Sequence, residues 1–223
     1  MLKPFLPVFL VLAGAILVAP AAAQQEAASV AQEGASLHFD AVGHRVTMPL
    51  PDWLTAAERL APNVVPLLES NTYADPKQAF VEFFPRGQNL ENYETTYAAR
   101  ITREPGRSLE DYRRAAIFGY SQGCKPQATG MFTFGEDTDA VFPALAFICG
   151  AYLDSVAGYA GLGAVVVSVF RKTDAGIAMI YQEWRGPAFD PYDPAGWPVS
   201  AEAFQARAEE IQATAELLVA AQP

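Results

Sequence analysis

Apolar and β-branched runs predict strands over most of the second half of the chain. Four such runs are punctuated by glycine and proline: 129–134, 144–153, 164–172 and 177–184. The last two flank residues 173–176, a short connection containing glycine that is typical of hairpins. We therefore expect these two strands to be adjacent and antiparallel.

The first half of the chain has a more mixed pattern. Two short runs, 37–39 and 45–48, predict an opening hairpin, and 79–84 predicts a further strand. Residues 54–70 have partly helical spacing, but Pro62 and Pro66 divide that segment into short pieces.

Helical spacing predicts three longer helices. The first begins after Asn89 and places Leu90, Tyr93, Tyr97 and Ile101 on one face. The second begins at Ser108, with Asp111 in the position of a capping box, and runs toward Gly119. The third follows Ser200, and its apolar stripe consists of Phe204, Ala208, Ile211, Ala215 and Leu218.

This order of elements indicates an α+β fold in which helices, including a long C-terminal one, pack on an antiparallel sheet. The arrangement resembles the PsbP-like fold, an antiparallel sheet sandwiched between helices. The resemblance covers most of residues 37–221 and is topological, with no diagnostic motif. It implies a binding or assembly module and no transferable catalytic residue.

The N-terminus has the pattern of a cleavable secretory signal peptide over residues 1–23. Lys3 precedes an apolar run over 5–19, and Ala21, Ala22 and Ala23 form a small-residue cleavage site. An uncleaved anchor is the alternative, but it needs roughly 20 apolar residues. Residues 24–36 are polar or small and predict a flexible linker, which leaves 37–223 as a single domain.

The charge balance and the predicted export restrict which partners and which cellular compartment we expect. The chain has 15 basic and 25 acidic side chains, which argues against nucleic acid and anionic membranes as partners. No membrane insertion is expected after signal cleavage, so we expect a periplasmic or extracellular protein. Its partner would be a protein, an envelope component or a small ligand.

Export favours a disulfide between Cys124 and Cys149, the only two cysteines. Cys124 precedes one predicted strand and Cys149 lies in the next, so the bridge would join neighbouring parts of one sheet. A reactive free thiol is the alternative, although only Lys125 lies close enough in sequence to lower a thiol pKa.

Residues 119–123 match the G-x-S-x-G pattern of serine hydrolases, with Ser121 as the nucleophile, and are similar to the form found in cutinases. That motif needs a strand before the serine and a histidine after it in the chain. Here a helix is predicted before Ser121, and both histidines, His38 and His44, precede it. A turn that ends a helix at a glycine is the simpler interpretation.

The remaining patterns do not indicate a cofactor or a metal. The acidic run 136–139 lacks the glycine and the distal glutamate of an EF-hand and indicates a solvated turn. The two histidines, six positions apart, could share a metal only with further ligands that the sequence does not indicate. Gly158, Gly161 and Gly163 have the wrong spacing for a dinucleotide site.

The segment from 184 to 198 combines aromatic, proline and acidic residues in the most unusual stretch of the domain. As a recognition loop it would use Trp184, Arg185, Phe189, Tyr192, Asp193 and Trp197. The alternative is that its aromatic side chains attach a long connection to the core. On balance the sequence predicts a non-catalytic exported binding module, with a secreted serine hydrolase as the other hypothesis.

Overall fold

Antiparallel strand pairing builds most of this structure, a computed structural model that describes residues 28–136 and 142–220. The predicted signal peptide, the first residues of the predicted linker and the acidic residues 137–139 lie outside the described residues.

A four-stranded sheet opens the fold. Its strands are β1 (Ser29–Glu33), β2 (Ser36–Ala41), β3 (His44–Pro49) and β11 (Glu216–Val219), in the order β1-β2-β3-β11. The predicted hairpin is confirmed, because β2 pairs with β3 in a register that places Phe39 opposite Val46. Alternate residues of this hairpin, such as Leu37 and Phe39, are fully buried, which explains why the pattern was readable.

A seven-stranded antiparallel sheet forms the centre of the molecule. Its strands are β4 (Glu69–Ala74), β5 (Gln78–Phe84), β6 (Thr95–Thr102), β7 (Thr129–Thr133), β8 (Leu145–Cys149), β9 (Leu162–Lys172) and β10 (Ile177–Pro187). They lie in the order β4-β5-β6-β10-β9-β8-β7. The predicted strands in the second half of the chain are confirmed, and β9 pairs antiparallel with β10 as expected.

The helices are short. They are α1 (Ala56–Arg59), α2 (Leu109–Gln122) and α3 (Ala201–Thr214), with 3₁₀ turns η1 (Val65–Leu67), η2 (Pro126–Ala128) and η3 (Pro194–Gly196). Two of the three predicted caps are present, since the Ser108 hydroxyl accepts a hydrogen bond from the backbone of Asp111 and the Ser200 hydroxyl accepts one from Ala203. Asn89 caps no helix, because the next element along the chain is strand β6.

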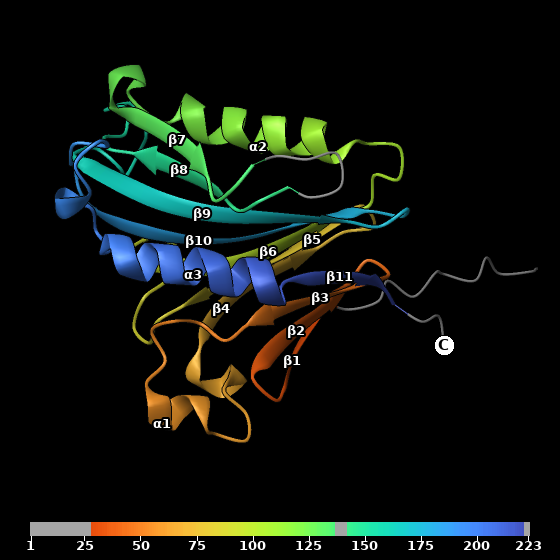
Figure 1. Ribbon diagram of the computed structural model, residues 1–223. Coiled ribbons are helices and arrows are strands. Elements are labelled where there is room, and N and C mark those ends of the chain that lie inside the picture. Colours follow the sequence, from red (N-terminus) through yellow and green to blue (C-terminus); the bar gives the residue numbers. More distant parts are fainter. Residues whose placement is uncertain (1–27, 137–141, 221–223) are drawn as a thin grey trace, which may run out of the picture.

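These elements form three layers (Figure 1). Helix α2 lies on one face of the seven-stranded sheet, near β8 and β9. The four-stranded sheet and α3 cover the opposite face, where α3 contacts β3 and β9. The main core lies in this second interface and includes the fully buried Phe83, Tyr97, Val167 and Ile180.

The predicted α+β fold with a PsbP-like sandwich and a long C-terminal helix is wrong. The described residues contain eleven strands in two antiparallel sheets and three short helices, so the fold is mostly β.

Strand β6 occupies the place where the first long helix was predicted. Tyr97 and Ile101 are four residues apart, and this spacing places side chains on one face of a strand as well as of a helix. Thr95, Thr96 and Thr102 are β-branched and favour the strand. Pairing with β5 on one side and β10 on the other satisfies the backbone of β6.

The C-terminal helix ends at Thr214, and the chain continues as β11 along the edge of β3. Arg171 on β9 caps this end of the helix, because its side chain donates hydrogen bonds to the carbonyl oxygens of Gln212 and Ala215 at 2.6 and 2.8 Å. Phe204, Ala208, Ile211 and Ala215 are buried as the predicted stripe requires, but Leu218 is exposed on β11.

The predicted linker is also wrong from Ser29 onward, since residues 29–33 form β1 and pair with β2. The side chain of Gln32 accepts a 2.6 Å hydrogen bond from the backbone of Val64, and Val30 packs against the core. A polar segment is ordered here because a stable hairpin offers it a row of backbone partners.

Candidate functional site

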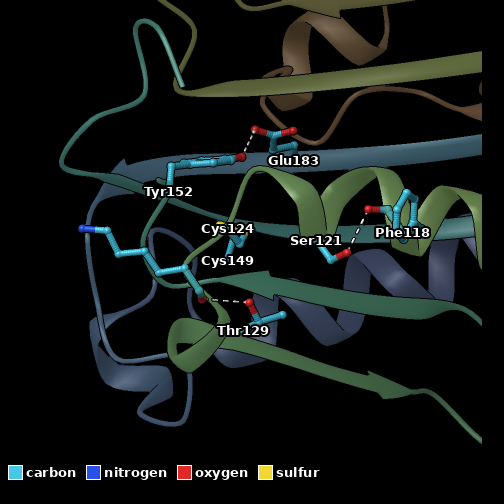
Figure 2. The surroundings of a disulfide bond; sticks show 8 residues. Phe118, Ser121, Cys124, Thr129, Cys149, Tyr152 and Glu183 are labelled. Carbon is cyan, nitrogen blue, oxygen red and sulfur yellow. Dashed lines mark hydrogen bonds between the residues drawn. A yellow bond between two sulfur atoms is a disulfide. The ribbon is translucent and has the colours of Figure 1, made fainter. Parts of the chain in front are cut away.

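Ser121 does not occupy a nucleophile elbow. It lies in the last turn of α2, which ends at Gln122 and is followed by Gly123. Its hydroxyl donates a 2.8 Å hydrogen bond to the carbonyl oxygen of Phe118 (Figure 2). The helix precedes the serine, whereas an elbow places a strand before it and a helix after it. The interpretation of residues 119–123 as a helix end is confirmed.

Both histidines lie in the four-stranded sheet, across the seven-stranded sheet from α2 (Figure 1). His44 is buried, and its ring nitrogens lie 3.1 Å from the Val42 carbonyl and 3.1 Å from the Thr173 hydroxyl. His38 Nδ1 lies 3.2 Å from the Thr47 hydroxyl, and His38 Nε2 lies 3.7 Å from the Glu33 carboxylate. The sheet thus separates Ser121 from any histidine base.

Cys124 and Cys149 form the predicted disulfide (Figure 2). Cys149 lies in β8 as expected, but Cys124 follows the end of α2 and makes an isolated bridge with Tyr152. The disulfide therefore fastens the C-terminal end of α2 to the sheet. This differs from the predicted link between neighbouring strands.

The aromatic loop is attached to the core by most of its large side chains. Trp184 and Trp197 both contact the ring of Phe204 on α3, at centroid distances of 5.7 and 5.6 Å. The backbone of Phe189 packs on Gly150 so closely that an added Cβ on that glycine would lie 2.5 Å from the Phe189 oxygen. These contacts support the core-attachment interpretation of the loop.

Only part of the predicted recognition surface is exposed. Tyr192 is 74 % exposed, and its hydroxyl donates a 3.3 Å hydrogen bond to the Thr129 carbonyl. Asp193 is exposed and accepts a hydrogen bond from the backbone of Ala195 at the start of η3. Trp184 and Arg185 are buried on β10, so these six residues do not form one continuous exposed surface.

The structure instead contains an open groove of about 490 Å³ between α2 and the outer face of the seven-stranded sheet. Its wall on α2 consists of Tyr112, Ala115, Ala116, Gly119 and Tyr120. Its floor consists of side chains from β5, β6 and β10, namely Gln78, Arg100, Thr102, Met179 and Tyr181. Glu104 and Arg107, from the connection before α2, close one end.

Two tyrosine hydroxyls at the groove are held in place by hydrogen-bonding partners. The Tyr112 hydroxyl lies 3.2 Å from the Thr102 hydroxyl, and the Tyr181 hydroxyl donates a 3.3 Å hydrogen bond to Glu82. Burial raises the pKa values of Tyr120 and Tyr181, and nearby carboxylates raise the pKa of Tyr181 further. Both hydroxyls therefore stay neutral and remain able to donate hydrogen bonds at ordinary pH.

A buried glutamate lies on the same sheet face, two residues beyond Tyr181. The Glu183 carboxylate accepts hydrogen bonds from the hydroxyls of Tyr93 at 3.1 Å and Tyr152 at 3.5 Å (Figure 2 shows Tyr152). The Tyr93 hydroxyl also lies 3.1 Å from that of Tyr159. Burial raises the pKa of Glu183 above its ordinary value, and the two hydrogen bonds and the charge of Arg185 offset part of this increase.

Arg185 completes this cluster. Its guanidinium lies 3.8 Å from the ring centroid of Tyr93 and 4.8 Å from that of Tyr159, and Nε donates a 2.9 Å hydrogen bond to the Tyr93 carbonyl. The cluster joins three parts of the chain: residues before β6, the connection between β8 and β9, and β10. Tyr93, Glu183 and Arg185 are buried, and Tyr152 and Tyr159 are half-buried, so we regard the cluster as the support for one end of the outer sheet face.

The described residues were also compared with the requirements of a metal site and of a membrane-spanning helix. Among residues 28–136 and 142–220, no group of three or more His, Cys, Asp or Glu side chains is placed to hold a metal ion. No helix in this same part of the chain is long and apolar enough to cross a membrane.

No protein-family model, characterised protein or solved structure matches this chain.

Sequence reasoning missed the groove, because its residues come from four separate elements. Tyr112 fell within the second predicted helix, Tyr120 within the G-x-S-x-G motif and Tyr181 within a predicted strand. Arg100 was assigned to a helix that does not exist. The available signal was the alternation of Arg100 with the buried Ala99 and Ile101, which places the arginine on the opposite face of a strand.

Proposed function

We propose that this protein is an exported, non-catalytic binding module whose ligand site is the groove between α2 and the seven-stranded sheet. The observation that carries the proposal is the groove itself. Its volume of about 490 Å³ lies in the range typical of sites for small molecules, and its lining combines three tyrosines and a methionine with a few charged and polar groups. A rigid sheet forms the floor and a disulfide holds the end of the helix that forms the wall.

Two features support export. The first 23 residues have the pattern of a signal peptide, and Cys124 and Cys149 are paired in a bond that persists mainly outside the cytoplasm. The chain also has a net charge of −10, which disfavours nucleic acid as the partner.

The proposal can be tested with the fluorescent dye 8-anilinonaphthalene-1-sulfonate and a variant that fills the groove. Gly119 lines the groove, and an added Cβ there would meet no atom within 4 Å, so Gly119→Trp has room for its side chain. We expect one dye molecule to bind per wild-type protein and Gly119→Trp to weaken this binding at least tenfold. Ala206→Trp, on the exposed side of α3, is the matched control and should bind normally. Equal binding by Gly119→Trp would contradict the proposal.

A further inference from the structure

The groove has an arginine that no carboxylate of the described residues neutralises. Arg100 is exposed on β6, and its guanidinium lies 5.7 Å from the centroid of the Phe80 ring on β5. No carboxylate among the described residues lies within 4.0 Å of it. This is notable in a chain with 25 acidic and 15 basic side chains.

Acidic side chains beside the groove already have partners. Glu104 forms a 2.8 Å ion pair with Arg107, whose guanidinium also lies over the ring of Tyr112 at 5.0 Å. Glu82 accepts a hydrogen bond from Tyr181. The lining residues therefore include two arginines against one glutamate, and because Glu104 pairs with Arg107, Arg100 is the lining arginine without an ion pair among the described residues.

The apolar part of the groove pairs small residues on α2 with larger side chains on the sheet. Between Tyr112 and Tyr120, the helical wall presents only the small residues Ala115, Ala116 and Gly119, while Met179 and Tyr181 lie on the floor. Aromatic rings stack favourably on such surfaces, and a thioether adds a favourable contact with a ring edge. An elongated flexible ligand would gain less from this wall than a planar one.

We infer that the ligand is a planar aromatic compound with a carboxylate group. The carboxylate would pair with the Arg100 guanidinium, which can donate two parallel hydrogen bonds to it. The ring would lie between the small residues of α2 and the side chains of Met179 and Tyr181. This inference rests on the proposed function, because it names the ligand of the same groove.

Calorimetric titration with a matched pair of probes tests the inference. We expect 1-naphthoate to bind the purified protein at least tenfold more tightly than its neutral analogue 1-naphthalenemethanol. Arg100→Gln should remove this preference while leaving the affinity for the alcohol unchanged. Arg103→Gln is the control, since Arg103 is exposed one residue after β6 and does not line the groove.

The possible failures are distinguishable. If both probes bind equally, or if Arg100→Gln keeps the preference for 1-naphthoate, the carboxylate inference is wrong. The proposed function would still stand in that case, provided that Gly119→Trp abolishes binding of both probes. If neither probe binds, or if Gly119→Trp binds both as the wild type does, the inference is wrong and the groove has lost its support as the ligand site. The melting temperature of each variant should equal that of the wild type, which would confirm that the substitutions leave the fold intact.

Discussion

The Tyr93 hydroxyl donates a 3.1 Å hydrogen bond to the carboxylate of Glu183, although the two residues are 90 positions apart in the chain. Tyr93 lies just before β6, and Glu183 lies near the end of β10. The contact is buried, so the carboxylate has exchanged water for tyrosine hydroxyls and the charge of Arg185. Because burial disfavours the ionised form, folding should depend on the protonation of this one glutamate.

The Glu183→Gln variant should reveal that dependence. Below pH 4.5, the ordinary pKa of the group, the carboxyl is mostly protonated in both the folded and the unfolded chain. Between pH 4.5 and the raised folded-state pKa, the folded protein binds more protons, so the free energy of unfolding falls as pH rises. The neutral amide of the variant would be free of this penalty, which is about 1.4 kcal/mol for each unit by which the pKa is raised.

Thermal unfolding at several pH values measures this effect. The melting temperature of Glu183→Gln, relative to the wild type, should rise as the pH increases from 4.5 toward neutrality. Glu94→Gln, an exposed glutamate near the same end of the sheet, should show no such trend. A relative melting temperature that falls over this range would show that the ionised carboxylate stabilises the fold.

Loss of the disulfide should lower stability without changing the fold. The bond closes a loop between residues 25 positions apart, and the chain-entropy model assigns about 3.5 kcal/mol to such a loop. For a domain of this size, calorimetry should show the melting temperature of the double variant Cys124→Ala, Cys149→Ala lowered by about 7–14 °C. A reducing agent should lower the wild type equally and leave the double variant unchanged. If reduction had no effect on the wild type, the bond would not contribute to stability.

Phe204 should be among the most sensitive positions of the core. Its ring contacts the rings of four other aromatic residues, which are Phe132, Phe134, Trp184 and Trp197. Phe204→Ala should cost about 3–5 kcal/mol in denaturant unfolding, because it removes a large buried side chain and leaves a cavity. Phe118→Ala is the control, since Phe118 is 64 % exposed on α2 and its loss should change stability by less than about 0.5 kcal/mol. Similar effects for both variants would contradict the assigned core.

Ser121 should not react as an activated nucleophile. Its hydroxyl is bound to the carbonyl of Phe118, and both histidines lie across the seven-stranded sheet from α2. We expect no labelling by a fluorophosphonate probe above the level of the Ser121→Ala variant. Stoichiometric labelling that disappears in Ser121→Ala would restore the hydrolase hypothesis.

The hairpin, the strands of the second half and the start of α2 could be predicted because each carries its own local signal. Leu37 and Phe39 alternate with polar residues, and Ser108 caps a helix through its own neighbours. The disulfide was predictable because only two cysteines are present. The hairpin, the strands and the helix start depend on residues close together in the sequence. The disulfide depends on two cysteines that have no other possible partner.

The errors came from elements whose form is decided by distant partners. The spacing of Tyr97 and Ile101 fits a helix and a strand equally, and only pairing with β5 and β10 decides between them. Helix α3 ends where Arg171 of β9 reaches its last carbonyls, a contact between residues more than 40 positions apart. The groove was not predictable for the same reason, since it exists only once β6 lies beside β10 and beneath the edge of α2.

The most direct test of the groove as the ligand site is an NMR titration of the ¹⁵N-labelled protein with 1-naphthoate. The account predicts that the largest amide shifts occur at residues 115–120 of α2 and at 179–181 of β10, and that Gly119→Trp removes them. Residues 189–197 of the aromatic loop should show little change. Shifts concentrated in that loop, and unaffected by Gly119→Trp, would contradict the account and place binding on Tyr192 and its neighbours.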